Sequence, residues 1–245
     1  MLNNKVVLIT GVSKGIGLSC MELCLKNNAY VIGVSRSKII SKSLNDKFKN
    51  KFKIIYGDIT KKNTIKKISK FQNDKKIFID CIANNAGMRF RKKFLDIKIE
   101  EFRKVFENNF YSIVSLSKEF INKAIKKKKL ISIVNISSIV GSRGFSELSA
   151  YSSSKGALDA FTKCLAVEFP KNVRINNVSP GFTKTSYFEK FKQNKKLYNW
   201  TLNNTPVNRW GNTDEISNLI IFLLSEKSSF ITGQNIFIDG GWTAK

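Results

Sequence analysis

TGVSKGIG, at residues 10–17, lies between an apolar run at Val6–Thr10 and a helix-like stretch from about Ile16 to Lys26. Glycines between a strand and a helix allow a tight turn and bring the backbone close to a pyrophosphate, which the helix N-terminus then stabilises. The spacing is GxxxGxG rather than GxGxxG, so a Gly-rich turn without a ligand is the alternative interpretation. The stretch predicts a nucleotide-binding turn whose candidate contacts are Gly11, Ser13, Lys14, Gly15, Ile16 and Gly17.

Outward from this turn, apolar strand-like runs alternate with helical stretches along the chain. Further strands are expected at residues 30–35, 53–56, 78–83, 130–136, 174–178 and 235–238, and further helices at 63–71, from about 99, at 150–168 and at 213–225. Strands rich in Val and Ile that alternate with helices indicate a parallel sheet covered on both faces. The sequence therefore predicts a single α/β domain over residues 1–245, with a Rossmann-type doubly wound parallel sheet of about seven strands and helices on both faces.

The composition argues against several classes of protein. A hydrophobic fraction of 42% and an aromatic fraction of 11% are typical of a globular chain. The longest apolar run near the C-terminus, Leu219–Leu224, is too short to span a bilayer, and residues 1–5 lack the pattern of a signal peptide. With no histidine and four scattered cysteines, we expect no metal site and no His-based triad. We expect a cytoplasmic protein with no membrane partner.

The charge is strongly basic, with 43 Lys and Arg against 18 Asp and Glu and a formal net charge of +25. Such an excess can indicate a nucleic-acid partner or an acidic surface. The lysines are dispersed, however, and accompany many Asn, Ile and Phe, which share AT-rich codons. Genome composition and a role for the charge are both open explanations, and we expect no nucleic-acid partner.

Polar and small residues follow the expected strands, at the edge where ligands of open α/β sheets bind. Val34-Ser35 is followed by Arg36, and an arginine here suits a ribose 2′-phosphate, whereas an acid would suit the free 2′-hydroxyl. The sequence therefore favours NADP(H) as the cofactor, with NAD(H) as the alternative. Further candidate cofactor contacts follow the third and fourth strands at Asp58, Ile59, Asn85, Ala86 and Gly87.

Several short motifs occur in a fixed order along the chain. They are TGVSKGIG at 10–17, Asp58, NNAG at 84–87, Asn109 in ENNF, Ser138 in NISSIVG, Tyr151-xxx-Lys155, SPGFTKT at 179–185, PVNRWG at 206–211, ITGQ at 231–234 and DGG at 239–241. In this order and spacing the sequence resembles the short-chain dehydrogenase/reductases over essentially its whole length. It looks most like the 3-oxoacyl-[acyl-carrier-protein] reductases, although many sugar and polyol dehydrogenases share these features.

The resemblance implies a role for each residue of the site. Ser138 would hydrogen-bond the substrate oxygen, Tyr151 would transfer the proton, and Lys155 would also bind the nicotinamide ribose. Asn109 would help to hold a water that links Lys155 to solvent. The resemblance further implies a substrate lid at residues 182–210, a homotetramer (with a dimer as the alternative), and cofactor contacts at Tyr151, Lys155, Pro180, Gly181, Thr183 and Thr185.

Tyr151 and Lys155, in the stretch AYSSSKGAL, would lie one helical turn apart on the same face. A free tyrosine titrates near pH ~10, and lowering its pKa by about 3 units requires roughly 4 kcal/mol. An ammonium about 5 Å away supplies on the order of 3 kcal/mol at an effective dielectric constant of ~20. We therefore expect Lys155 to lower the pKa of Tyr151 by most of that amount, and a positively charged nicotinamide ring to supply the rest.

The implied function is an oxidoreductase that transfers a hydride between NADP(H) and a carbonyl or alcohol substrate, most closely a ketoacyl thioester on a carrier. A sugar, polyol or other small-alcohol dehydrogenase is the first alternative. A catalytically silent nucleotide sensor is a remote one, since such a chain would be expected to lose Ser138, Tyr151 or Lys155. Arg89 and Arg91, which border the expected site, either attract an acidic substrate or are solvated. The aromatic residues of the lid either contact substrate or pack a small helical flap.

Overall fold

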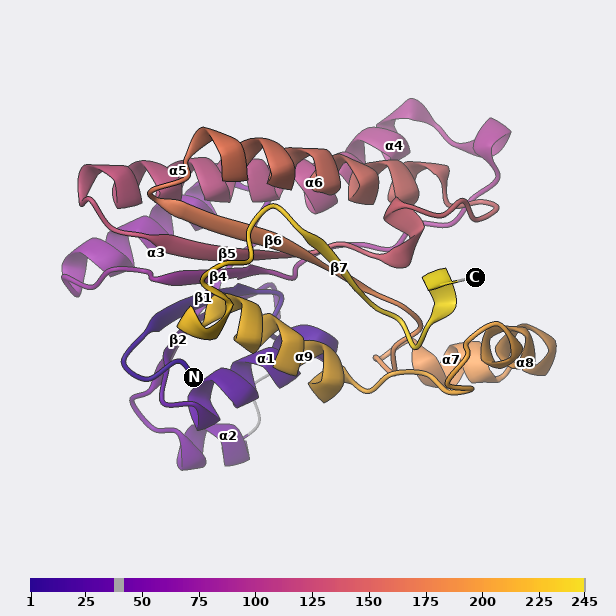
Figure 1. Ribbon diagram of the computed structural model, residues 1–245, viewed down its shortest axis with the longest axis horizontal. Coiled ribbons are helices and arrows are strands. Elements are labelled where there is room, and N and C mark those ends of the chain that lie inside the picture. Colours follow the sequence, from indigo (N-terminus) through magenta and orange to yellow (C-terminus); the bar gives the residue numbers. More distant parts are fainter. Residues whose placement is uncertain (38–41, 245) are drawn as a thin grey trace.

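Seven parallel strands form one sheet in the computed structural model, which describes residues 1–37 and 42–244 (Figure 1). The strands are β1 Val6–Thr10, β2 Tyr30–Ser35, β3 Phe52–Tyr56, β4 Cys81–Asn84, β5 Ile131–Ile136, β6 Val173–Pro180 and β7 Asn235–Ile238. Their spatial order is β3-β2-β1-β4-β5-β6-β7, and all neighbouring pairs are parallel. The order changes direction between β1 and β4, which makes the carboxyl edge of these strands the expected ligand site. The predicted doubly wound sheet is confirmed.

Helices cover both faces of the sheet (Figure 1). One face carries α1 Gly15–Lys26, α2 Lys42–Lys47 and α9 Thr213–Leu224, and the other carries α3 Lys62–Asp74, α4 Ile99–Phe106, α5 Ser112–Lys126 and α6 Ser149–Glu168. Two short helices, α7 Phe188–Lys192 and α8 Lys195–Asn203, extend from one end of the molecule, beyond the covered sheet. No helix in the described ranges is both long enough and apolar enough to cross a membrane.

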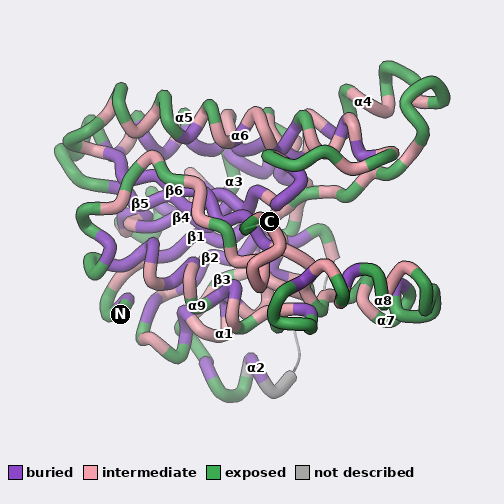
Figure 2. The backbone as a smooth tube through the Cα atoms, turned by 45° about the vertical axis from the view of Figure 1, so that its right-hand side comes forward, coloured by how far each residue is buried: buried purple, intermediate pink, exposed green. Residues whose placement is uncertain are grey.

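Alternate residues of the central strands pack into two separate cores. Val7 and Ile9 of β1 face α1 and α9, whereas Leu8 between them faces α3 and α5. Such strands are continuous apolar runs in the sequence, because both faces of each strand are buried. Figure 2 shows this as a purple sheet under helices whose outer sides are green. The sheet is therefore a rigid base for the loops at its carboxyl edge.

Three local features differ from the sequence expectation. β4 begins at Cys81 rather than Phe78, because pairing with β1 starts at Val7 and Cys81, while the Asp80 carboxylate accepts a hydrogen bond from the Val6 amide at 2.8 Å. The helix expected from residue 99 is interrupted by a π-helical turn at Glu107–Tyr111 between α4 and α5. The short helix α2 was not expected from the sequence.

Candidate active site

The turn between β1 and α1 is braced by the loop that follows β4. The hydroxyl of Thr10 accepts hydrogen bonds from the backbone amides of Asn85 and Ala86, at 3.0 and 2.9 Å. The Asn85 side-chain amide donates to the carbonyl oxygens of Thr10 and Gly11, at 3.0 and 3.1 Å. The polar groups of two strand ends thus satisfy each other, and the turn keeps one shape without help from a ligand.

Glycine is required in this turn for two separate reasons. Gly11 has φ +76°, in the left-handed region that favours glycine. A Cβ atom on Gly17 would lie 2.2 Å from the Gly11 carbonyl oxygen and 2.4 Å from the Asn85 amide nitrogen, so no other residue fits. The backbone at the N-terminus of α1 therefore stays uncovered by side chains, as a cradle for an anion must.

Ser138 and Tyr151 lie together on the wall of a cavity of about 650 Å³ at the carboxyl edge of the sheet. Ser138 follows β5 and caps a short 3-10 turn at Ile139–Gly141, and this turn packs tightly on α6, which carries Tyr151. The Ser138 hydroxyl accepts a hydrogen bond from the Val140 amide at 3.4 Å, and its influence on the Tyr151 phenol lowers the pKa of that phenol, against the larger effect of burial. Besides Tyr151, seven predicted cofactor contacts line the same cavity: Lys14, Ile16, Gly87, Pro180, Gly181, Thr183 and Thr185.

Lys155 and Asn109 lie buried behind this wall. The Lys155 ammonium donates to the Ile136 carbonyl oxygen at 2.6 Å. The Asn109 amide donates to the Met88 carbonyl and to Ser154, both at 3.0 Å, and its oxygen accepts from the Met88 amide at 2.8 Å. Asn109 therefore fixes the backbone that leaves β4 against α6, which keeps Gly87 close to the Lys155 ammonium.

Three hydrogen-bond donors converge on the carboxylate of Asp159, which lies one turn beyond Lys155 on α6. It accepts from Asn177 at 2.8 Å, from Asn235 at 2.9 Å and from Ser137 at 3.3 Å. Burial raises its pKa, and these hydrogen bonds oppose that shift. Asp159 ties the ends of β5, β6 and β7 to α6, and its charge partly offsets the desolvation of Lys155.

The expected electrostatic relation between Lys155 and Tyr151 is not found. Burial raises the pKa of Tyr151, and the cation that acts against this shift is Arg89 rather than Lys155. The Lys155 ammonium lies 5.8 Å from the centre of the Tyr151 ring and is turned toward the backbone of β5. Burial also lowers the pKa of Lys155 itself, to about 8. Both members of the pair are desolvated, an effect that the sequence estimate left out.

The remaining predicted cofactor contacts lie outside the lining of this cavity, and most follow the carboxyl ends of β1 to β4. Asp58 accepts from the Thr60 amide and hydroxyl at 3.0 and 2.9 Å. Burial raises its pKa, but these bonds together with the charges of Arg36 and Lys61 shift it downward overall. The whole group is Gly11, Ser13, Gly15, Gly17, Arg36, Asp58, Ile59, Asn85 and Ala86.

A second cavity of about 790 Å³ adjoins the first and shares lining residues with it. Its apolar wall includes Phe145, Phe182 and Trp242, and the Trp242 ring lies 5.0 Å from the ring of Phe182 and 6.0 Å from that of Phe145. Trp242 and Arg143 were missed by the sequence reasoning. No spacing signal marks either of them, because only the path of the chain after β7 and after Ser138 brings them here.

The aromatic residues of 182–210 divide into two groups. Phe188, Phe191 and Tyr198 pack around the buried Trp210, with ring centres 5.1, 4.9 and 6.0 Å away. Tyr187 lines the first cavity and Trp200 the second, and both are exposed. One group therefore forms a small core that holds α7 and α8 together, and the other is open to whatever enters the cavities.

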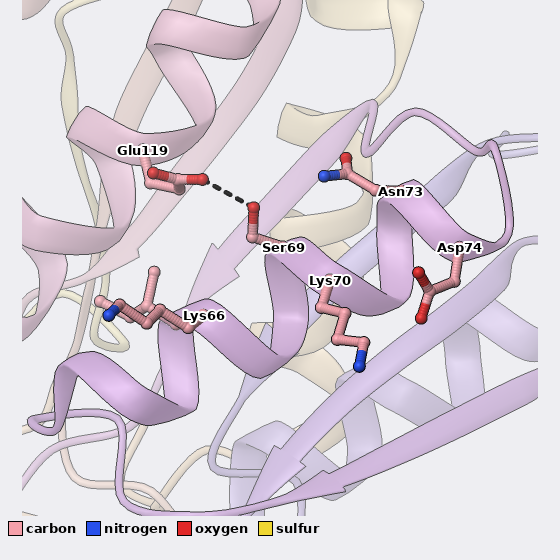
Figure 3. A pocket seen from close by; sticks show the side chains of 7 residues that line it. Lys66, Ser69, Lys70, Asn73, Asp74 and Glu119 are labelled. Atoms are coloured by element: carbon pink, nitrogen blue, oxygen red, sulfur yellow. Dashed lines mark hydrogen bonds between the residues drawn. The ribbon is translucent and has the colours of Figure 1, made fainter.

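A smaller hollow of about 300 Å³ lies elsewhere, between α3 and α5 (Figure 3). Figure 3 marks the hydrogen bond that Ser69 donates to Glu119 at 2.7 Å across this hollow. The Lys123 ammonium lies beside both side chains. These bonds join the two helices. In the described part of the chain no three Cys, Asp or Glu side chains gather as a metal site.

Comparison with known proteins agrees with this geometry. A family model described as enoyl-(acyl carrier protein) reductase matches residues 11–243. The chain belongs to the short-chain dehydrogenase/reductase family. It is therefore an oxidoreductase, and the resemblance expected from the sequence is confirmed.

Relatives in this family match over nearly the full length. A 3-oxoacyl-[acyl-carrier-protein] reductase of Buchnera aphidicola subsp. Acyrthosiphon pisum is 34% identical over 242 residues, 98% of each chain. A tropinone reductase homolog of Arabidopsis thaliana is 34% identical over 251 residues, 99% of this chain and 93% of that one. The structure of a 4-hydroxyisoleucine dehydrogenase complexed with NADH has a TM-score of 0.91 and 33% identity, and covers 99% of this chain and 100% of that one.

Proposed function

We propose that this chain is a carbonyl reductase in which Tyr151 gives a proton to the substrate oxygen while NADP(H) supplies the hydride. One observation carries the proposal: Ser138 and Tyr151 line the same cavity as Lys14 and Ile16 of the glycine-rich turn. A proton donor, a hydrogen-bond partner for the same oxygen and an anion cradle therefore lie around one space.

The residues at the sheet edge fit a nicotinamide dinucleotide. Gly11 and Gly17 leave the backbone at the start of α1 bare, and a pyrophosphate needs this close approach. Pro180, Gly181, Thr183 and Thr185 would hold the nicotinamide end, next to Tyr151. Arg36, exposed after β2, would take the 2′-phosphate of NADP(H). Asp58, Ile59, Asn85 and Ala86 complete the proposed contacts along the edge.

The chain's own residues would move and hold the proton. The Tyr151 phenol is protonated at neutral pH, because burial raises its pKa, and it is thus ready to donate during reduction. Ser138 would keep the carbonyl oxygen within reach of the phenol. Lys155 lies behind Tyr151 and would bind the ribose, while Asn109 fixes the loop beside both. Asn109 would also hold the water that returns a proton from solvent to Lys155.

We propose a 3-oxoacyl thioester as substrate, because reductases of such thioesters are among the relatives at 30–35% identity over almost the whole chain. A second candidate, a dehydrogenase of a small alcohol, is favoured by the similarity to 4-hydroxyisoleucine dehydrogenase. Within this single domain, residues 182–210 would act as a lid, since α7 and α8 reach past the sheet and carry Tyr187 and Trp200 to the cavities. The reaction would take place in the cytoplasm.

A substrate panel tests the proposal. NADPH oxidation is followed by absorbance with acetoacetyl thioesters, keto-sugars and simple ketones, each at several concentrations. We expect turnover with the thioesters at the lowest KM. Activity with keto-sugars alone would move the assignment to the second candidate. A chain that binds NADPH and reduces none of these compounds would be a nucleotide sensor instead.

The cofactor assignment has a test of its own. The Arg36→Ala variant should bind NADPH roughly tenfold to a hundredfold more weakly, because a charged hydrogen bond to the 2′-phosphate is lost. NADH affinity should stay the same, since that cofactor has no 2′-phosphate. Unchanged NADPH affinity, measured by fluorescence titration, would refute the role of Arg36.

A further inference from the structure

The second cavity has an uneven distribution of charge. Arg89, Arg91, Arg143 and Lys196 line it, and none of the described residues that line either cavity is Asp or Glu. The same lining includes the aromatic rings of Phe145, Phe182, Trp200 and Trp242. A cavity with cationic and aromatic side chains and no carboxylate suits a molecule that has both an anionic group and a carbon skeleton.

The three arginines that line this cavity differ in the interactions that they make with the rest of the protein. Arg91 forms an ion pair with Glu147 at 2.7 Å, so its charge is largely balanced. Arg143 donates to the Thr243 carbonyl oxygen at 2.8 Å. Arg89 has no carboxylate within 4 Å among the described residues, and its guanidinium lies over the Tyr187 ring, 5.1 Å from the ring centre. The charge of Arg89 is thus available to a ligand.

The backbone around Arg89 is held firmly. Asn109 binds both the amide and the carbonyl of Met88, the preceding residue. On the other side, the Lys92 amide donates to the Glu147 carbonyl at 2.9 Å. Because the backbone on both sides of Arg89 is fixed by hydrogen bonds, less conformational entropy is lost when this residue binds a ligand. This favours a binding role for Arg89 over that of a solvated surface charge.

Arg89 also lies close to the reacting centre. It is one of the residues that line both cavities, and its charge lowers the pKa of the Tyr151 phenol. An anion bound at Arg89 would therefore place the rest of a small molecule beside Tyr151 and Ser138.

We propose that Arg89 binds an anionic group, a carboxylate or a phosphate, on the carbonyl substrate. This inference rests on the proposed function and narrows it: the substrate is an oxo compound with an oxyanion at one end. Guanidinium matches both groups, because its fork of N–H donors fits two oxygens at once. The anion is either the substrate's own carboxylate or a phosphate on the thioester carrier, and matched pairs of compounds separate the two sources.

The first pair is acetoacetate and its methyl ester, which differ only in the carboxylate. The second pair is acetoacetyl-phosphopantetheine and acetoacetyl-pantetheine, which differ only in the phosphate. Affinity for each compound is measured by calorimetry with NADP⁺ present, so that no reduction can occur, and kcat/KM is then measured with NADPH. Wild-type protein should prefer the anionic member of at least one pair by roughly tenfold to a hundredfold.

The Arg89→Gln variant should lose that preference and keep its affinity for the neutral member, whereas Arg89→Lys should keep part of it. Comparing two compounds within one variant removes any effect of Arg89 on Tyr151. Arg103→Gln is the matched control, because Arg103 is exposed on α4 and lines neither cavity, and it should leave the preference unchanged.

The outcomes distinguish this inference from the proposed function. A preference for acetoacetate over its ester identifies a substrate carboxylate, and a preference for acetoacetyl-phosphopantetheine over acetoacetyl-pantetheine identifies a carrier phosphate. Equal affinity within both pairs, or an unchanged preference in Arg89→Gln, overturns the role of Arg89. Preferential binding of the anion without turnover of any compound supports Arg89 and refutes the reductase assignment.

Discussion

At the level of single residues, the site contains a charge that is unfavourable for folding. The Lys155 side chain is 5% exposed, and its ammonium donates to one backbone carbonyl, that of Ile136. Burial lowers its pKa to about 8. Below that pH the folded protein must hold a poorly hydrated ammonium, which Asp159 only partly offsets. A buried lysine of this kind is explained by its function rather than by stability.

Replacing this lysine should therefore stabilise the protein. Lys155→Met should raise the free energy of unfolding at pH 7 by about 1–3 kcal/mol, because the desolvation of an ammonium is removed. The unfolded chain holds this proton up to its ordinary pKa, whereas the folded chain releases it near pH 8. Wild-type stability thus rises between about pH 8 and 10, and the difference between the two proteins should shrink there. Denaturant unfolding at pH 7 and pH 9.5 measures both values; a less stable variant at pH 7 would contradict the argument.

Some of the residues of the site can be predicted from the sequence, and others cannot. Tyr151 and Lys155 can be predicted because a four-residue spacing on a helix is a local property. The effect of Lys155 on the pKa of Tyr151 could not be predicted, because that pKa depends on which groups bury the two side chains and on the position of Arg89. Asp159 was missed for the same reason, since its partners Asn177 and Asn235 are distant in sequence.

At the level of elements, the helix expected from residue 99 shows what periodicity misses. Apolar spacing predicts the helix but not the π-helical turn at Glu107–Tyr111 within it. That turn contains Asn109, which is fully buried against the loop after β4, whereas its neighbour Asn108 is half-buried and bonds its own helix. Such turns often occur at functional sites, because they redirect one side chain without ending the helix.

The two ends of α9 allow a matched comparison. At its C-terminus, the buried guanidinium of Arg174 donates to the Leu223 and Ser225 carbonyl oxygens and to the Ser228 hydroxyl. At its N-terminus, Arg209 forms an exposed pair with Glu215 at 2.7 Å. Arg174→Met should lower the free energy of unfolding by about 2–4 kcal/mol, because it leaves buried acceptors unpaired.

Arg209→Met should change stability only slightly, since exposed ion pairs contribute little. Thermal and denaturant unfolding of the two variants under the same conditions gives the comparison. Equal effects would show that the bonds of Arg174 do not stabilise the end of α9.

At the level of the whole molecule, apolar side chains remain exposed on particular faces. They lie on α4 and its neighbouring turn, at the end of α6, and on the C-terminal segment that carries the edge strand β7: Leu95, Ile99, Tyr111, Val167, Phe230 and Phe237. We propose that the homotetramer implied by the family resemblance assembles through these faces. Single exposed apolar residues are ordinary, but grouped ones indicate contact with another chain.

Light scattering after size exclusion should therefore give four times the 27.8 kDa mass of one chain. Val167→Glu should shift the protein to a smaller species, because it would bury an unpaired charge at the interface. Tyr56→Glu is the control, since Tyr56 is exposed on β3, at the other edge of the sheet. A wild-type monomer at micromolar concentration would contradict the assembly.

The central claim is that Tyr151 donates the proton, and Tyr151→Phe tests it most directly. This change removes one hydroxyl and keeps the ring that packs beside Phe145 and Leu148. With NADPH and acetoacetyl-CoA, the variant should lose turnover by a factor of about 10² to 10⁴, while its NADPH affinity and its melting temperature stay close to those of wild type. If Tyr151→Phe reduces the substrate at the wild-type rate, Tyr151 is not the proton donor.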